Sequence, residues 1–349
     1  MSFDLFAEHG PGGIPAIDAL VRAESVDAGH RISLLTLSRL SEQREFAKEQ
    51  YARLAAGGAS RHKALAAGLG LLSPGVDDLP LLPPGSLFAR LPFKLVRSYL
   101  SKDDDSFYPI DNPVLKERVF RLPMVSASGW KGALRAAASS LLRKGLARKQ
   151  DADFETWASY RTRLLLLFGS ETAHTAAPWN LLAHRLFSME PNEAQARFTD
   201  HIETMDILHD TPSRQGYLSC FPTYFDRLGF EILNPHDRSN RSGQDPVSIE
   251  CVPAGSAGQL EFLFVPFDSP ASSLSAEDLW VSCELAFRAA KRVLHGGFGA
   301  KTSSGYGRAF LTSPATVQIR SRSGVEERTF QNWTELQQFQ ANGLKAVFE

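Results

Sequence analysis

The sequence predicts an α+β protein whose sheet is mostly antiparallel. Extended apolar stretches alternate with helical stretches rich in alanine and leucine, and they do so without the regular βαβ repeats that accompany a parallel sheet. No tandem repeat or low-complexity tract interrupts them. The chain has 349 residues, of which 43% are hydrophobic and 22% charged, so it is long enough to bury a core without disulfides or structural metal.

The composition also excludes several classes of protein. No run of about 18 apolar residues occurs, and the first residues do not combine a basic region with an apolar one, so we expect neither a membrane span nor a secretory signal. The three cysteines, Cys220, Cys251 and Cys283, are widely spaced and form no C-x-x-C pair. This spacing favours a reduced, cytoplasmic protein.

Residues 1–84 are expected to form a helical N-terminal extension. Apolar residues between Ile32 and Leu54 follow an approximately helical spacing, and Leu65–Leu72 is a candidate for a second, short helix. The proline- and glycine-rich stretch that follows is a natural boundary between this helical extension and the rest of the chain. We therefore place the main body of the protein at residues 85–349.

The first half of this body begins with a strand and continues with two helices. Ser86–Leu100 has the composition of a strand, although Pro92 predicts an edge position or a bulge. Val114–Val125 is a second extended stretch. Ser126 then offers a side-chain cap for an alanine-rich helix, and Phe154–Phe168 is expected to form the next helix.

The second half contains more turns. Residues 170–250 carry many turn signals, so we expect an insertion around 195–250 with an exposed loop at His236–Asp245. Gln259–Phe267 alternates like a strand. Ala276–Leu294 is expected to be a helix that leads through a glycine-rich loop into a strand at Arg308–Leu311.

The formal net charge of −1 conceals a segregation of charges. Neither Ser128–Gln150 nor Arg288–Arg308 contains an acidic residue, and both are rich in lysine and arginine. Two basic clusters on a neutral chain are typical of a surface that binds a polyanion. Two solvated helices are the alternative explanation.

The glycine-rich loop Gly296–Arg308 is the sharpest local motif. Its glycines alternate with lysine, threonine and serine, so backbone N–H groups can approach a phosphate closely. Ala300 and Thr302 stand where a Walker A loop and a dinucleotide loop require glycine, which argues against binding of NTP or NAD. A structural glycine turn remains the alternative to the cradling of a phosphodiester chain. The candidate RNA-binding residues of this loop are Gly297, Gly299, Lys301, Thr302, Ser303, Ser304 and Arg308.

The helix that starts after Ser126 is a second candidate anion site. The first N–H groups of a helix attract anions, and Ser128 lies in the same flexible turn. Lys131 and Arg135 are four residues apart and share one helix face, so a phosphate at the helix start would meet both. The alternative is a capped helix with two surface cations.

Acidic residues gather in Asp103–Pro113. Clustered carboxylates can hold a divalent metal, or a single aspartate can act on an RNA 2′-hydroxyl as acid or base. Asp111, before an Asn-Pro turn, is the most constrained of them, although an aspartate there is often only a turn former. The segment His201–Asp210 lacks a strong metal-ligand spacing, so no metal site is assigned, and no hydrolase triad is supported.

Taken together, these motifs resemble the RAMP superfamily of CRISPR effector subunits, the RNA-binding components of type III interference complexes. IDNPV at Ile110–Val114 and LPMVSASGWKGALR at Leu122–Arg135 are similar to two family segments, and FGAKTSSGYGR at Phe298–Arg308 is similar to the C-terminal glycine-rich signature. Phe221–Gly255 resembles the region before the final core strand in the capping subunit of type III-B complexes. The resemblance spans residues 86–311, and we place no family counterpart for the first 84 residues.

The resemblance implies a ferredoxin-like sheet of the RNA-recognition-motif type, with helical insertions and a thumb-like insertion. It implies that the glycine loop and the Lys131–Arg135 helix start hold the backbone of a guide RNA, and we add Arg238 and Arg241 from the polar loop as RNA-binding candidates. It places Asp111 at the position of the aspartate that cuts target RNA in the repeating backbone subunit, with Mg²⁺ as the expected cofactor. Trp130 replaces a smaller family residue, and we favour packing in the core over stacking on a base.

The expected function is therefore that of a guide-RNA-binding subunit in a type III complex, with guide RNA, target RNA and other subunits as partners. The resemblance to a capping subunit conflicts with Asp111, so a non-catalytic cap is one alternative. A free-standing endonuclease that processes guide RNA is another, with His295 as its candidate catalytic residue. A metabolic enzyme or scaffold with incidental glycine turns is the third.

Overall fold

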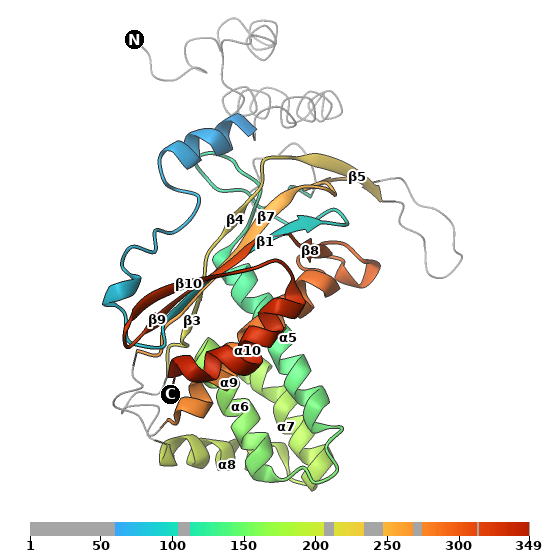
Figure 1. Cartoon of the computed structure of the whole chain (residues 1–349). Coiled ribbons are helices and arrows are strands. Elements are labelled where there is room, and N and C mark those ends of the chain that lie inside the picture. The colour runs from blue at the N-terminus through green and yellow to red at the C-terminus, as the bar shows by residue number, and fades with distance from the viewer. Residues whose placement is uncertain are drawn as a thin grey trace, which may run out of the picture.

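The structure is a computed structural model that describes residues 60–103, 112–205, 213–233, 247–267, 274–312 and 314–348 (Figure 1). An antiparallel sheet lies at its centre, with strand order β10-β9-β1-β7-β3 and with β8 also paired to β1. Its strands are β1 (Leu87–Leu95), β3 (Leu218–Cys220), β7 (Ala257–Phe264), β8 (Ala309–Leu311), β9 (Ala315–Ser321) and β10 (Gly324–Phe330).

Two helices complete a ferredoxin-like core. These are α5 (Ala127–Leu146) and α9 (Ala276–Gly296), and the chain runs β1-α5-β3-β7-α9-β8 while the sheet runs β8-β1-β7-β3. This is the split βαβ arrangement. Phe93 of β1 contacts Trp130 of α5, and Phe262 of β7 contacts Phe287 of α9, so both helices cover one face of the sheet. The predicted α+β class and antiparallel sheet are confirmed.

Pro92 lies in the central strand of the sheet, opposite Gln259 in an uninterrupted register with β7, so the predicted edge position or bulge is wrong. On one side β1 pairs with β7 along almost its whole length. On the other side it pairs with β9 through residues 87–90 and with β8 through residues 93–95. Pro92 falls between these two partners, and its carbonyl accepts a hydrogen bond from Thr312 N at 2.8 Å on that side. The missing N–H of proline therefore falls where the ladder is already interrupted.

Three helices form a lobe between α5 and β3: α6 (Phe154–Phe168), α7 (Ala173–Phe187) and α8 (Pro191–Thr204). The predicted helix at Phe154–Phe168 is confirmed, whereas α7 and α8 replace the turns expected there. Pro191 is the first residue of α8, where no N–H is needed, and Pro178 is tolerated inside α7 beside the fully buried Trp179. Burial of the lobe outweighs these local turn signals.

Two short antiparallel pairs stand outside the main sheet. β2 (Met124–Val125) pairs with β4 (Thr223–Tyr224), and β5 (Gly229–Leu233) pairs with β6 (Val247–Cys251). We call the second pair the β5–β6 ribbon. It is inserted between β3 and β7, within the region where the sequence predicts an insertion, and residues 234–246 between its strands lie outside the described residues.

The ends of the described chain pack on this core. Residues 60–68 form a helix, and the segment that follows reaches the sheet face opposite α5 and α9, where Ser73 donates a hydrogen bond to Glu261 of β7 at 2.8 Å. The expected helix at 32–54 lies outside the described residues. A C-terminal helix, α10 (Trp333–Phe348), lies beside α9 (Figure 1). Among the described helices, none has the length and apolar character needed to cross a membrane.

Candidate RNA-binding site

A cluster of aromatic rings joins the start of α5 to the glycine-rich loop. Trp130 is fully buried, its Nε1–H donates to Thr223 Oγ1 at 2.9 Å, and its ring centroid lies 4.5 Å from that of Phe298. Phe93 of β1 contacts both rings. Two motifs that are far apart in sequence thus meet at one end of the sheet, and the interpretation of Trp130 as a core residue is confirmed.

The start of α5 leaves one cation available. Ser126 caps the helix by accepting a hydrogen bond from Gly129 N at 3.0 Å, and the exposed Ser128 lies beside it, with 3.2 Å between the two hydroxyl oxygens. Lys131 is half-buried and forms no hydrogen bond or ion pair with the described residues. Burial lowers its pKa; the nearby Cys220 thiol opposes that shift and the positive charge of Arg135 adds to it. A phosphate would relieve this unfavourable environment.

Arg135 has a different environment from Lys131. Its Nη2 donates to the carbonyl oxygens of Gly169 and Ser170 at 2.6 and 3.1 Å, just beyond the last residue of α6. Its guanidinium carbon also lies 5.9 Å from the centre of the Phe168 ring. Cations are favourable at the C-terminal end of a helix, so Arg135 links α5 to α6.

Because Lys131 has no partner among the described residues and Arg135 links two helices, we expect their removal to affect RNA binding and stability, respectively. Lys131→Ala should weaken RNA binding about equally for all sequences and reduce the slope of log K against log[salt] by about 0.7, the value for one phosphate on a single strand. Arg135→Ala should chiefly lower the free energy of unfolding, because it removes the link to α6. Filter-binding titrations at several salt concentrations, combined with urea unfolding, measure both quantities. An unchanged slope for Lys131→Ala would show that the helix start does not contact RNA.

The glycine-rich loop is folded tightly against the segment that follows β1. Gly307 N donates to Ser98 O at 2.9 Å, and Ala300 N donates to Leu100 O at 2.7 Å. Gly299 and Gly307 have φ values of +83° and +70°, and a Cβ at either position would overlap a backbone carbonyl oxygen, that of Leu100 or that of Phe298. These glycines are therefore required by the fold of the loop.

Other N–H groups of the same loop are free to bind an anion. Within the described chain, the N–H groups of Lys301, Thr302 and Ser303 donate no hydrogen bond, and neither does that of Gly299. Lys301 is left-handed, with φ 54° and ψ 33°, and a 3₁₀ turn, η3 (Thr302–Ser304), follows it. Successive N–H groups in such an arrangement form a concave anion site. The side chains of Lys301, Ser303, Ser304 and Arg308 are exposed around it.

A groove of about 830 Å³ adjoins the loop between α5 and α9. Small side chains of α5 form one wall: Ala133, Ala136 and Ala137, with Leu141 beyond them. The opposite wall consists of residues on α9 that share one helix face: Arg288, Lys291, Arg292 and His295. Gly297, Gly299 and Thr302 line the end of the groove next to the loop. The charge pattern indicated a basic cluster here, but the groove depends on α5, which the local sequence of α9 does not reveal.

His295 is exposed at the loop end of this groove. Burial by neighbouring atoms, together with the charges of Lys291 and Arg308, lowers its pKa, so the neutral imidazole is favoured. Arg308 also donates its Nε–H to the carbonyl oxygen of His295 at 3.0 Å, which ties the side chain of Arg308 to the end of α9.

A sequence profile of the RAMP superfamily matches residues 53–310. The chain belongs to the RAMP superfamily. The matched range contains both the α5 start and the glycine-rich loop, so the elements that meet around Trp130 and Phe298 lie within the family's region.

Three solved structures that this chain is similar to have low sequence identity to it. A subunit of the type III-B Cmr-beta complex bound to cognate target RNA is 11% identical, with a TM-score of 0.46, and the match covers 90% of this chain and 97% of that one. Csm3 of Methanopyrus kandleri is 17% identical, with a TM-score of 0.40 and coverage of 68% and 78%. A chain of a type III-A Csm3–Csm4 subcomplex is 12% identical, with a TM-score of 0.36 and coverage of 73% and 95%. No curated protein sequence matches.

Three site candidates of this RAMP protein, Asp111, Arg238 and Arg241, lie outside the described residues. The residues next to Asp111 are described: Asn112 O accepts a hydrogen bond from Glu250 N of β6 at 3.1 Å. Arg238 and Arg241 belong to the stretch that connects β5 to β6. The described residue that follows Asp111 therefore contacts the β5–β6 ribbon.

The described residues offer little other chemistry. They contain no group of three or more His, Cys, Asp or Glu side chains placed to hold a metal ion, so Mg²⁺ stays an expectation tied to Asp111. Burial raises the pKa of the Cys220 and Cys251 thiols to about 12, and it raises that of Cys283 as well. None of these thiols is therefore activated as a nucleophile.

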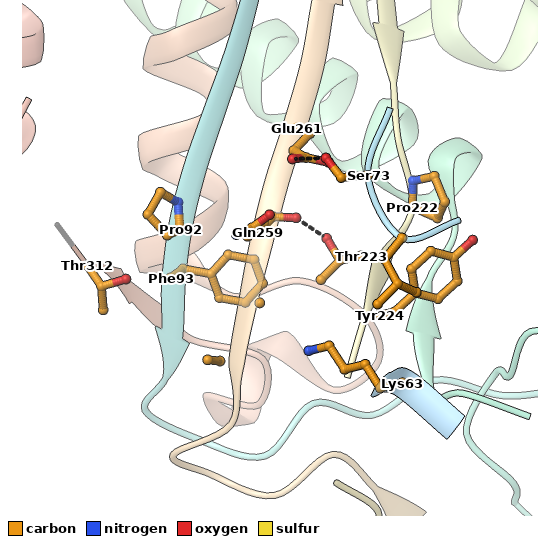
Figure 2. A pocket seen from close by; sticks show the side chains of 13 residues that line it. Lys63, Ser73, Pro92, Phe93, Pro222, Thr223, Tyr224, Gln259, Glu261 and Thr312 are labelled. Atoms are coloured by element: carbon orange, nitrogen blue, oxygen red, sulfur yellow. Dashed lines mark hydrogen bonds between the residues drawn. The ribbon is translucent and has the colours of Figure 1, made fainter. Parts of the chain in front are cut away.

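A second cavity, of about 300 Å³, lies over the opposite face of the sheet (Figure 2). Its lining is mixed, with prolines and aromatic rings beside Lys63, Gln259 and Thr312. Glu261 at its edge already accepts hydrogen bonds from Ser73 and from Arg90 Nε, at 2.8 and 2.6 Å. With one lysine in its lining, this cavity suits a polyanion less well than the groove beside α9, and no motif in the sequence indicated it.

Proposed function

We propose that this RAMP protein is a guide-RNA-binding subunit of a type III CRISPR interference complex. The observation that carries the proposal is the convergence at one end of the sheet of the free loop N–H groups, the exposed Lys301 and the helix start with Lys131. A protein that accepts guides of any sequence must hold them by the phosphate backbone, and this set of donors and cations suits phosphates rather than base edges. Guide RNA, target RNA and neighbouring subunits are its proposed partners.

The groove beside α9 extends this site. Its cationic wall starts next to the glycine loop, and Arg288 and His295 are about two helical turns apart, roughly 10 Å along the axis. Lys291 donates a hydrogen bond to Gln337 of α10 at 3.0 Å, and Arg288 lies 3.9 Å from the carboxylate of Glu284 on α9. Arg292 is exposed. A strand whose backbone is bound at the loop would meet further positive charge along this groove.

We further propose that Asp111 cuts the guide-paired target RNA. The 2′-oxygen of the target attacks the adjacent phosphorus, a 2′,3′-cyclic phosphate forms, and the bond to the 5′-oxygen breaks. Asp111 accepts the 2′-hydroxyl proton, and the 5′-oxygen leaves as a hydroxyl after it gains a proton from solvent. A divalent ion such as Mg²⁺ would stabilise charge on the phosphate. The support from the structure is that the chain directly after Asp111 is fixed by Glu250.

The test uses the co-expressed complex loaded with guide RNA. With end-labelled complementary RNA and magnesium, Asp111→Ala should abolish particular cuts while target binding persists, and the exposed Asp151→Ala serves as the matched control. An unchanged pattern of cuts on a denaturing gel would make this chain a non-catalytic cap. Cleavage of precursor RNA by the isolated chain without metal, lost in His295→Ala, would instead support a guide-processing endonuclease.

A further inference from the structure

The β5–β6 ribbon lies between the glycine-rich loop and the segment Asn112–Lys116. In its register Glu231 is opposite Ile249, and Glu250 is opposite Phe230. Because side chains alternate between the two faces of a strand, Glu231 and Glu250 point to opposite faces of the ribbon. Each carboxylate contacts a different part of the candidate site.

Glu231 attaches the ribbon to the glycine loop. Its Oε2 accepts a hydrogen bond from Tyr306 Oη at 3.0 Å, and its Oε1 accepts one from Ser98 Oγ at 2.5 Å. Tyr306 stands between Gly305 and Gly307. The guanidinium carbon of Arg97 lies 5.5 Å from the centre of the Tyr306 ring. A small apolar cluster on the same face of the ribbon supports this attachment, and it consists of Leu100, Ile249, Cys251 and Tyr306.

Glu250 attaches the other face to the segment after Asp111. Its side chain is fully buried, its Oε2 accepts a hydrogen bond from Val114 N at 2.8 Å, and the same oxygen forms an ion pair with Lys116. Lys116 is itself buried, and this burial lowers its pKa although Glu250 opposes the shift. A buried ion pair that loses one partner leaves an uncompensated charge, so we expect removal of Glu250 or of Lys116 to destabilise this attachment.

We propose that Glu231 and Glu250 are positioning residues that hold the glycine loop at a fixed separation from the segment following Asp111. A glycine-rich loop has high conformational freedom, and Tyr306 is its one large polar side chain with a partner on the ribbon. A carboxylate beside an RNA site repels phosphate, so Glu231 acts on RNA through the loop that it orders. The inference rests on the proposed function, because it assigns this loop to guide RNA.

The first test measures the affinity for a single-stranded RNA against salt concentration. Glu231→Ala should lower the affinity by at least about tenfold and reduce the salt slope by about 0.7, because Lys301 no longer stays in place to contact its phosphate. Glu231→Gln should keep the wild-type affinity, since an amide can still form hydrogen bonds with the hydroxyls of Tyr306 and Ser98. The exposed Glu277→Ala is the matched control. Wild-type affinity and slope in Glu231→Ala would overturn the inference.

Hydrogen exchange provides a second readout that does not depend on RNA. Glu231→Ala should accelerate exchange in residues 298–307, and Glu250→Gln should accelerate it in residues 112–116, each without a large change in the other segment. If wild type binds no RNA but the two segments respond in this way, the proposed function fails and the positioning role stands. Unchanged exchange in both variants would overturn the positioning role itself.

Discussion

Gly307→Ala should weaken the binding of guide RNA by at least about tenfold, which corresponds to about 1.4 kcal/mol. Gly307 has a φ of +70°, and an added Cβ would overlap the carbonyl oxygen of Phe298, so the backbone of the loop must move. This movement would separate the N–H groups of Lys301–Ser303 from the groove beside α9. Fluorescence-anisotropy titrations with a labelled RNA would measure the loss.

Gly296→Ala is the matched control for this effect. Gly296 lies at the end of α9 in the same glycine-rich stretch, but a Cβ added there meets nothing within 4 Å and its φ is not in the left-handed region. Its affinity for RNA and its thermal unfolding should match those of wild type. Equal loss of binding in both variants would mean that flexibility in general, rather than the close approach at Gly307, determines the function of the loop.

Arg161→Met should lower the free energy of unfolding by about 3–5 kcal/mol, because it leaves buried polar partners without their cation. Arg161 is fully buried in the helical lobe, and each of its nitrogens is used. Its Nε, Nη1 and Nη2 donate to Glu171, Asn180 and Gln195 at 2.8, 2.9 and 2.6 Å. The guanidinium carbon also lies 4.0 Å from the centre of the Phe198 ring, which packs it into the core of α6, α7 and α8.

An exposed arginine of the same lobe supplies the comparison. Arg197 forms an ion pair with Glu193 at 2.9 Å, but both side chains are about half exposed, so Arg197→Ala should cost less than about 1 kcal/mol. Urea unfolding of wild type and the two variants measures the difference. If Arg161→Met unfolds at the wild-type urea concentration, the network contributes no net stability to the lobe.

Local signals predicted the parts of the fold that local chemistry determines. Ser126 caps α5 as expected, α6 has the predicted bounds, and the helix before the glycine loop begins at Ala276 as predicted. The predicted position of Pro92 and the turns expected where α7 lies are wrong for a shared reason. Whether a proline is tolerated depends on partners distant in sequence, the gap between β8 and β9 in one case and the burial of Trp179 in the other.

In the candidate site, too, residue type and spacing predict some features, whereas others depend on partners distant in sequence. The glycine loop and Lys131 could be proposed as anion-binding candidates from residue type and spacing. The environment of Arg135 could not be predicted, because its carbonyl partners at Gly169 and Ser170 come from the end of another helix. Glu231 and Glu250 carried no signal in the sequence, since acids on a strand near an expected polyanion site acquire a role only through the register of the ribbon.

The most direct test of the central claim is the binding of the full chain to two unrelated single-stranded RNAs over a range of salt concentrations. Phosphate contacts at the glycine loop, the α5 start and the groove predict equal affinities for the two sequences. They also predict that log K falls linearly with log[salt], with a slope of about −2 or steeper for three or more phosphates. Binding that is absent, or that does not respond to salt, would contradict the assignment of this surface to RNA.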